Sequence, residues 1–160
     1  MKRFLQFALL SSVVFACGGS NNSPQTVFNA SLKGSNEVPS NASTATGTAK
    51  FTLNPDNTIT WTASSTPLAG KYSLSHIHLG AAGASGSPIV TTTSSLTQAA
   101  DGSVSGGGTI TAPDATAKNA DGTPRSFDQL IAAMRAGTTY YHIPDPPTYG
   151  GGEIRGQLGP

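Results

Sequence analysis

The sequence predicts a single all-β domain that carries one short helix. Charged residues make up only 11% of the 160 residues, whereas Gly, Ser, Thr and Ala are plentiful, a composition common in extracellular β proteins and poor for helical bundles. Apolar and polar residues alternate in short runs separated by Gly, Pro, Asn and Asp, which is typical of strands joined by turns. About 140 residues follow an N-terminal leader, enough for one hydrophobic core and too few for two.

The first residues have the layout of a secretory signal peptide. Lys2 and Arg3 precede an apolar run over residues 4–16, which is too short to cross a bilayer comfortably. The run ends in Val14-Phe15-Ala16-Cys17, which resembles the lipobox of bacterial lipoproteins. We therefore expect a signal peptide over residues 1–16 and lipidation of Cys17, the only cysteine in the chain. The alternative is an ordinary secretory leader, which would leave an exposed free thiol in an oxidising compartment.

Residues 17–26 are expected to form the lipidated N-terminus and a flexible tether, because residues 18–24 are rich in Gly, Ser and Asn. The anchor would make a membrane the first partner and would place the protein in the cell envelope, outside the cytoplasm. Gly18 after the cysteine favours the outer membrane if the cell is Gram-negative. The nine Lys and Arg residues less Lys2 and Arg3 leave seven basic against eight acidic side chains. Without a basic stripe, nucleic-acid binding has no electrostatic basis.

Eight strands are expected along the remainder of the chain. The first covers residues 27–32. Residues 47–53 and 58–64 should form a hairpin around the turn Asn54-Pro55-Asp56-Asn57. The other strands are expected at 72–79, 88–93, 103–111, 138–143 and 153–158, with the third of these weakened by Gly106-Gly107-Gly108 and a loop over 144–152 before the last.

One segment, residues 126–136, has helical rather than strand periodicity. Ser126 is a suitable N-cap residue, Gln129 follows three residues later, and Gly137 stands just past the end. The apolar residues at 127, 130, 131 and 134 fall on one face. The sequence therefore predicts a single short helix laid across the β domain.

Five segments follow one another along the chain: Phe28-Asn29-Ala30-Ser31-Leu32-Lys33-Gly34, Asn36-Glu37-Val38-Pro39, Ala45-Thr46-Gly47-Thr48-Ala49, His76-Ile77-His78-Leu79-Gly80-Ala81-Ala82-Gly83 and Gly152-Glu153-Ile154-Arg155-Gly156-Gln157-Leu158. In this order and spacing they resemble the successive motifs of the CHRD domain, which is named for chordin and also occurs in bacterial secreted proteins and lipoproteins. The resemblance covers about residues 27–158 and implies an immunoglobulin-like antiparallel β-sandwich. It implies no particular activity, because the bacterial members have no generally accepted function and a fold does not supply one.

The sequence departs from the family pattern at one position. The family usually has a histidine near the end of the Tyr-rich strand, where this chain has Pro144. His142 lies two residues earlier and keeps the same strand parity, so it is a candidate substitute.

The pair His76 and His78 is the sharpest chemical feature. Two imidazoles one residue apart on a strand point to the same face and can bind one metal ion. Together with His142 they would supply three nitrogen ligands, a set that copper and zinc both accept, and Glu37 or Glu153 would be the nearest carboxylate. The alternative is a structural pair of histidines that hydrogen-bond neighbouring loops.

Glu153 and Arg155 share one face of the last strand. They are expected to form an ion pair or to hydrogen-bond loop backbone, since buried charges need partners; the functional alternative makes Arg155 a contact for an anion. Glu37 is expected to brace a turn. No Gly-x-Ser-x-Gly elbow is present, so no catalytic residue is assigned.

Three functional hypotheses follow. The first is a non-catalytic, lipid-tethered binding or structural module. The second is a copper- or zinc-binding, superoxide-dismutase-like redox protein that uses the three histidines. The third is a binder of an extracellular protein or polysaccharide.

Overall fold

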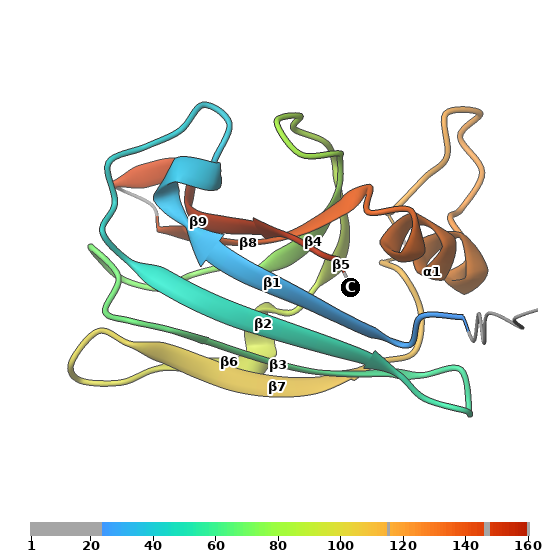
Figure 1. Cartoon of the computed structure of the whole chain (residues 1–160), viewed down its shortest axis with the longest axis horizontal. Coiled ribbons are helices and arrows are strands. Elements are labelled where there is room, and N and C mark those ends of the chain that lie inside the picture. Colours follow the sequence, from blue (N-terminus) through green and yellow to red (C-terminus); the bar gives the residue numbers. More distant parts are fainter. Residues whose placement is uncertain (1–23, 115, 146–147, 160) are drawn as a thin grey trace, which may run out of the picture.

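The computed structural model describes residues 24–114, 116–145 and 148–159 (Figure 1). The leader and the lipidation candidate Cys17 lie outside the described residues. No helix in the described part is long and apolar enough to span a membrane. The strands are β1 (Val27–Lys33), β2 (Thr46–Leu53), β3 (Ile59–Ser65), β4 (His76–Leu79), β5 (Pro88–Thr91), β6 (Leu96–Gln98), β7 (Val104–Ile110), β8 (Thr139–Asp145) and β9 (Tyr149–Gln157), and the helices are α1 (Phe127–Arg135) and the short 3-10 turns Gly34–Asn36 and Thr93–Ser95.

The nine strands form one antiparallel sheet in the order β5-β4-β8-β9-β1-β2-β3-β7-β6. The sheet curls, so that β4, β5, β8 and β9 lie over β2, β3 and β7 (Figure 1). The edge strands β5 and β6 are consecutive in the chain, and only Thr92 and the turn Thr93–Ser95 separate them. The prediction of an antiparallel β-sandwich with a single short helix is confirmed.

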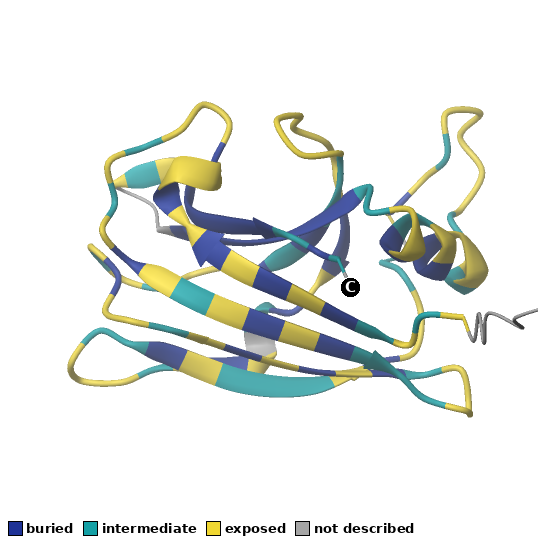
Figure 2. Ribbon diagram, in the orientation of Figure 1, coloured by how far each residue is buried: buried dark blue, intermediate teal, exposed yellow. Residues whose placement is uncertain are grey.

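The core lies between the two halves of the curled sheet. Buried and exposed residues alternate along β1 and β2 (Figure 2), as the pleat of a strand requires when one face is covered. Phe51 of β2 stacks on Trp61 of β3 with ring centroids 5.9 Å apart. Tyr141 of β8 meets Phe51 edge-on at 5.4 Å. The contact between Tyr141 and Phe51 joins strands from opposite halves of the sandwich.

The helix α1 begins at the predicted cap. Ser126 Oγ accepts a bond from Gln129 N at 3.2 Å, and Ser126 N donates to Gln129 Oε1 at 2.9 Å, which is a complete capping box. Leu130, Ile131 and Met134 are buried. The apolar face therefore docks on the sandwich, as the periodicity predicts.

The largest differences between the predicted and observed strands occur in three places. The strand expected over 72–79 begins only at His76, because Tyr72 N bonds Gln98 Oε1 at 2.9 Å and Ser75 N bonds Thr93 Oγ1 at 3.1 Å instead of joining the ladder. The three-residue strand β6 was not predicted, since it is too short to show an alternating pattern. The expected loop over 144–152 is shorter, because β8 continues to Asp145 and β9 starts at Tyr149.

Candidate functional site

The polar residues selected from the sequence meet on the outer face of β4, β8 and β9. Cross-strand register places His76, His142 and Arg155 in one row. A second row contains His78, Tyr140 and Gln157. Neighbouring residues of the opposite strand parity, such as Ile77 and Ile154, point into the core. We call the two rows, together with Glu153, the polar layer.

Loops cover the polar layer, so its side chains are partly or fully buried although they face away from the core. Arg155 is 2% exposed and Glu153 is fully buried. The covering segments are residues 34–45 after β1 and residues 80–87 after β4. Both faces of this part of the sheet are therefore covered. Charged side chains that the strand pattern alone would place in solvent are buried here.

His78 lies at the centre of the histidine group. Its ring centroid is 5.4 Å from that of His76 and 5.0 Å from that of His142. Its ring also stacks on Tyr140 at 4.9 Å. His78 Nδ1 lies 2.8 Å from Gly86 O, and because a carbonyl only accepts, Nδ1 must carry the proton. The lone pair is then on Nε2, which is buried and has no partner among the described residues.

Both β4 histidines are neutral at pH 7. Burial lowers the pKa of His78 from 6.5 to about 4, opposed by the bond to the Gly86 carbonyl and assisted by electrostatic contributions from His142, His76 and Arg155. Burial also lowers the pKa of His76, with a further contribution from His142. Neutral imidazoles are the form that binds metals and accepts hydrogen bonds.

This depressed pKa predicts acid destabilisation. The unfolded chain takes up a proton on His78 near pH 6.5 and the folded chain only near pH 4, so stability falls as the pH drops through that window. After discounting for the exposed part of the ring we expect a loss of about 1–2 kcal/mol. Urea unfolding with a chelator at pH 7 and pH 4.5 measures it. His78→Gln should lose less stability over this window than the wild type, and an equal loss in both proteins would exclude His78 as the cause.

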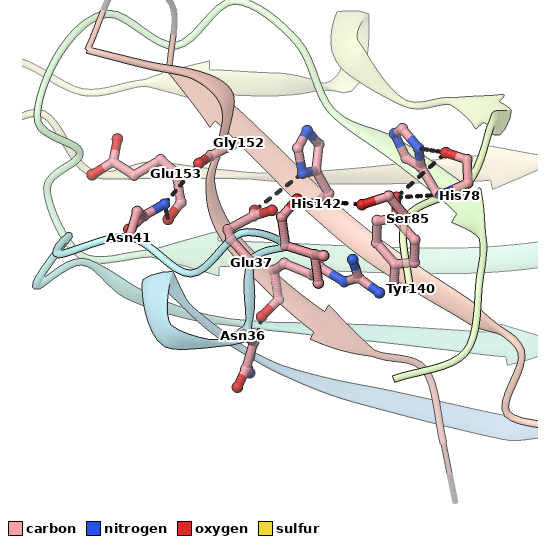
Figure 3. A network of polar contacts seen from close by, with 12 residues as sticks. Asn36, Glu37, Asn41, His78, Ser85, Tyr140, His142, Gly152 and Glu153 are labelled. Carbon is pink, nitrogen blue, oxygen red and sulfur yellow. Dashed lines mark hydrogen bonds and ion pairs between the residues drawn. The ribbon is translucent and has the colours of Figure 1, made fainter. Parts of the chain in front are cut away.

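Glu37 and His142 form a buried contact between the loop after β1 and strand β8 (Figure 3). His142 Nδ1 lies 3.1 Å from Glu37 Oε1. It is the only acid–base pair within 4.0 Å that the described residues contain. Gly152 lies against this pair, and a Cβ at that position would meet both side chains.

Arg155 holds the loop over residues 80–87. Its guanidinium carbon lies 3.3 Å from the centroid of the Tyr140 ring, a cation–π contact. Its Nη2 donates to Ala81 O at 3.2 Å and to Ala84 O at 2.7 Å. The adjacent Gln157 donates from Nε2 to Gly80 O at 2.8 Å. Both side chains therefore bind loop backbone.

Glu153 joins β9 to two other segments. Its Oε1 accepts from Ser43 Oγ at 2.7 Å and from Ala69 N at 2.9 Å. Asn41 Nδ2 donates to the carbonyls of Gly152 and Glu153 at 2.8 and 3.1 Å (Figure 3). Of the two roles expected for Glu153 and Arg155, the structure shows hydrogen bonding to loops, and no ion pair joins these two described residues.

The three histidines are neighbours, but among the residues that the structure describes no group of three His, Cys, Asp or Glu side chains is arranged to hold a metal ion. Sequence reasoning missed Tyr140, Gln157 and Asn41 as members of the network. Gln157 shares strand parity with Arg155, which is a signal that sequence alone offered. Asn41 lies in a polar loop, and no sequence signal marked it as a member of the network.

Comparison with known proteins gave one positive result. A family model described as the CHRD domain matches residues 28–158. No curated protein and no solved structure matches the chain.

Proposed function

This chain belongs to the CHRD domain family, and from that membership we propose that it is a non-catalytic binding or structural module tethered to the cell envelope. The family suggests a binding or structural module in general. The envelope location, the tether and the absence of catalysis are the specific parts of the proposal.

The binding role is supported by the hydrogen bonds between the polar layer and the loops that cover it. Arg155 and Gln157 bond the backbone of residues 80–84, while Glu153 and Asn41 tie the segments near residues 43 and 69 to β9. Loops held by buried side chains lose little conformational entropy when a ligand binds. Binding residues are often found on loops positioned by a rigid scaffold, and this end of the sandwich has that construction.

The lipid tether is supported by the leader pattern before Cys17. We expect the wild-type protein to partition with membranes and into detergent, and its mature N-terminus to be an acylated Cys17 by intact mass. Cys17→Ser should remove the acyl mass and release the domain from the membrane fraction. Ser20→Ala, in the same tether, is the control and should behave as wild type. Unchanged membrane retention of the serine variant would contradict anchoring at Cys17.

A second candidate function is binding of copper or zinc by His76, His78 and His142, and the buried lone pair on His78 Nε2 favours it. A ligating nitrogen lies about 2.1 Å from a metal, which puts the centroids of two ligating rings about 5 Å apart. The centroid separations of His78 from His76 and from His142, 5.4 and 5.0 Å, are close to this value. Because the described residues form no three-ligand group as they stand, metal uptake would require the rings to turn toward one point. His78 Nδ1 and His142 Nδ1 also contact a carbonyl and a carboxylate, the outer partners that metal-binding histidines usually have.

Metal analysis tests this candidate directly. We expect the purified, tag-free protein to take up about one equivalent of Cu²⁺ or Zn²⁺, and His76→Ala combined with His78→Ala to abolish uptake. Mg²⁺ is the control ion, because it prefers oxygen ligands. Protein that neither retains nor takes up copper or zinc would end the metal hypothesis and its superoxide-dismutase-like extension.

A further inference from the structure

A cleft of about 330 Å³ opens beside the polar layer. One wall is the segment 35–38 after β1, and the other is the turn at residues 82–83. Arg155 and Gln157 of β9 also line it. Typical ligand sites have volumes of about 300–1,000 Å³. The volume of this cleft lies near the lower end of that range, so the cleft suits a small ligand.

Arg155 brings a buried positive charge to this cleft. It is 2% exposed, and no carboxylate of the described residues lies within 4.0 Å of its guanidinium. Buried charges normally have an opposite charge as partner. Among the described residues, only its Nη2 donates hydrogen bonds. The donors on Nε and Nη1 are left for a bound molecule. Because both forks of a guanidinium include Nη2, a bound carboxylate would accept a single charge-assisted bond from Nη1 or Nε.

Glu37 restricts which carboxylate the cleft accepts. It also lines the cleft, and its Oε1 is held by His142. A carboxylate placed near Glu37 would be repelled, whereas hydroxyl groups can donate to it. Asn36 uses its Nδ2 on Ser31 O and Arg155 O and keeps Oδ1 as an acceptor. A ligand with one carboxylate and several hydroxyls can satisfy both Arg155 and the wall that contains Asn36 and Glu37.

We propose that this cleft binds a uronic acid unit of an acidic polysaccharide, with the sugar carboxylate on Arg155 and its hydroxyls on Glu37 and Asn36. The proposal rests on the proposed binding role and names its ligand class. An acidic peptide fits less well, because peptide affinity depends on apolar anchors in pockets and the apolar side chains here are only Val38 and Ala82.

The probe is oligogalacturonate, titrated into the full mature chain by calorimetry at low ionic strength, with the fully methyl-esterified oligosaccharide as control. Two variants of Ala82 leave the bonds from Arg155 to Ala81 O and Ala84 O in place, since Ala82 is exposed in the turn that Arg155 holds. Ala82→Glu should weaken binding about tenfold and Ala82→Lys should strengthen it, because each adds one charge beside the guanidinium. High salt should shrink both effects.

Binding of the acid form only, with opposite effects of the two variants, supports the proposal. The proposal is overturned if the protein does not bind the oligosaccharide, if it binds the esterified form equally well, or if the charge at position 82 does not change the affinity. A pull-down from envelope extract with the wild type and Ala82→Glu distinguishes failure of the uronic acid proposal from failure of the general binding role. A component retained equally by both proteins would leave the binding role standing and place its surface elsewhere. Recovery of acidic peptides rather than glycan would also overturn the polysaccharide assignment.

Discussion

Gly152→Ala is expected to destabilise the domain by about 3 kcal/mol or more, a fall in Tm of about 10 °C. A Cβ on Gly152 would lie 2.5 Å from Glu37 Oε1 and would also clash with the His142 ring. Gly152 has φ +139°, in a region that side chains rarely adopt. The new methyl group must therefore strain the backbone and separate two buried polar side chains, which is costly once they lose their partner.

The neighbouring glycine provides a matched control. Gly151→Ala adds the same methyl group where nothing lies within 4 Å, at an exposed position. Its unfolding free energy should stay within about 0.5 kcal/mol of wild type. If urea unfolding gave the two variants equal stability, the close packing of Gly152 against the Glu37 and His142 pair would be wrong.

Glu153→Leu is expected to cost about 3–5 kcal/mol, because the fully buried carboxylate is the partner of Ser43 Oγ and Ala69 N. Leucine fills the space but leaves a buried hydroxyl and a backbone amide without an acceptor. The loop that contains Ala69 should then open before the rest of the sandwich. Hydrogen exchange of the Ala69 amide measures that opening, and thermal unfolding measures the global loss.

Glu153→Gln separates hydrogen bonding from charge. An amide oxygen in the place of Oε1 can still accept from both Ser43 Oγ and Ala69 N. Only the longer bond from Ala69 N to Oε2, at 3.2 Å, is lost. This variant should lose only about 1 kcal/mol and keep the Ala69 amide protected. A glutamine variant as unstable as the leucine variant would mean that the charge itself, and not the pair of hydrogen bonds, holds these segments together.

Much of the fold was predictable because local patterns and tertiary packing agree. Residues of even number along β1, such as Phe28 and Leu32, are buried and their neighbours are exposed, as their apolar and polar types predict. The capping box of Ser126 and Gln129 is a local interaction that needs no distant partner. The prediction was poor at residues 72–75, where bonds to Gln98 and Thr93 replace the strand ladder.

The candidate site was predictable as a set of residue types but not as a network. Strand parity puts His76 and His78 on one face, and they do lie side by side. Nothing in the sequence pairs Glu37 with His142, since 105 positions separate them. The same holds for Arg155 and the carbonyls of Ala81 and Ala84, which it reaches across 74 and 71 positions.

Sequence by itself determined the class of fold, the helix and the residues that carry charge on β9, because periodicity, caps and turns act over a few residues. Only the tertiary structure decided that the outer face of β4, β8 and β9 is covered by loops, that Arg155 meets carbonyls and the face of Tyr140 rather than a carboxylate, and that His78 Nε2 has no partner among the described residues. The physical reason is that burial, and with it the pKa of His78 and the free donors of Arg155, depends on which distant loops close over the sheet. A strand pattern records which face a side chain takes and not what covers it.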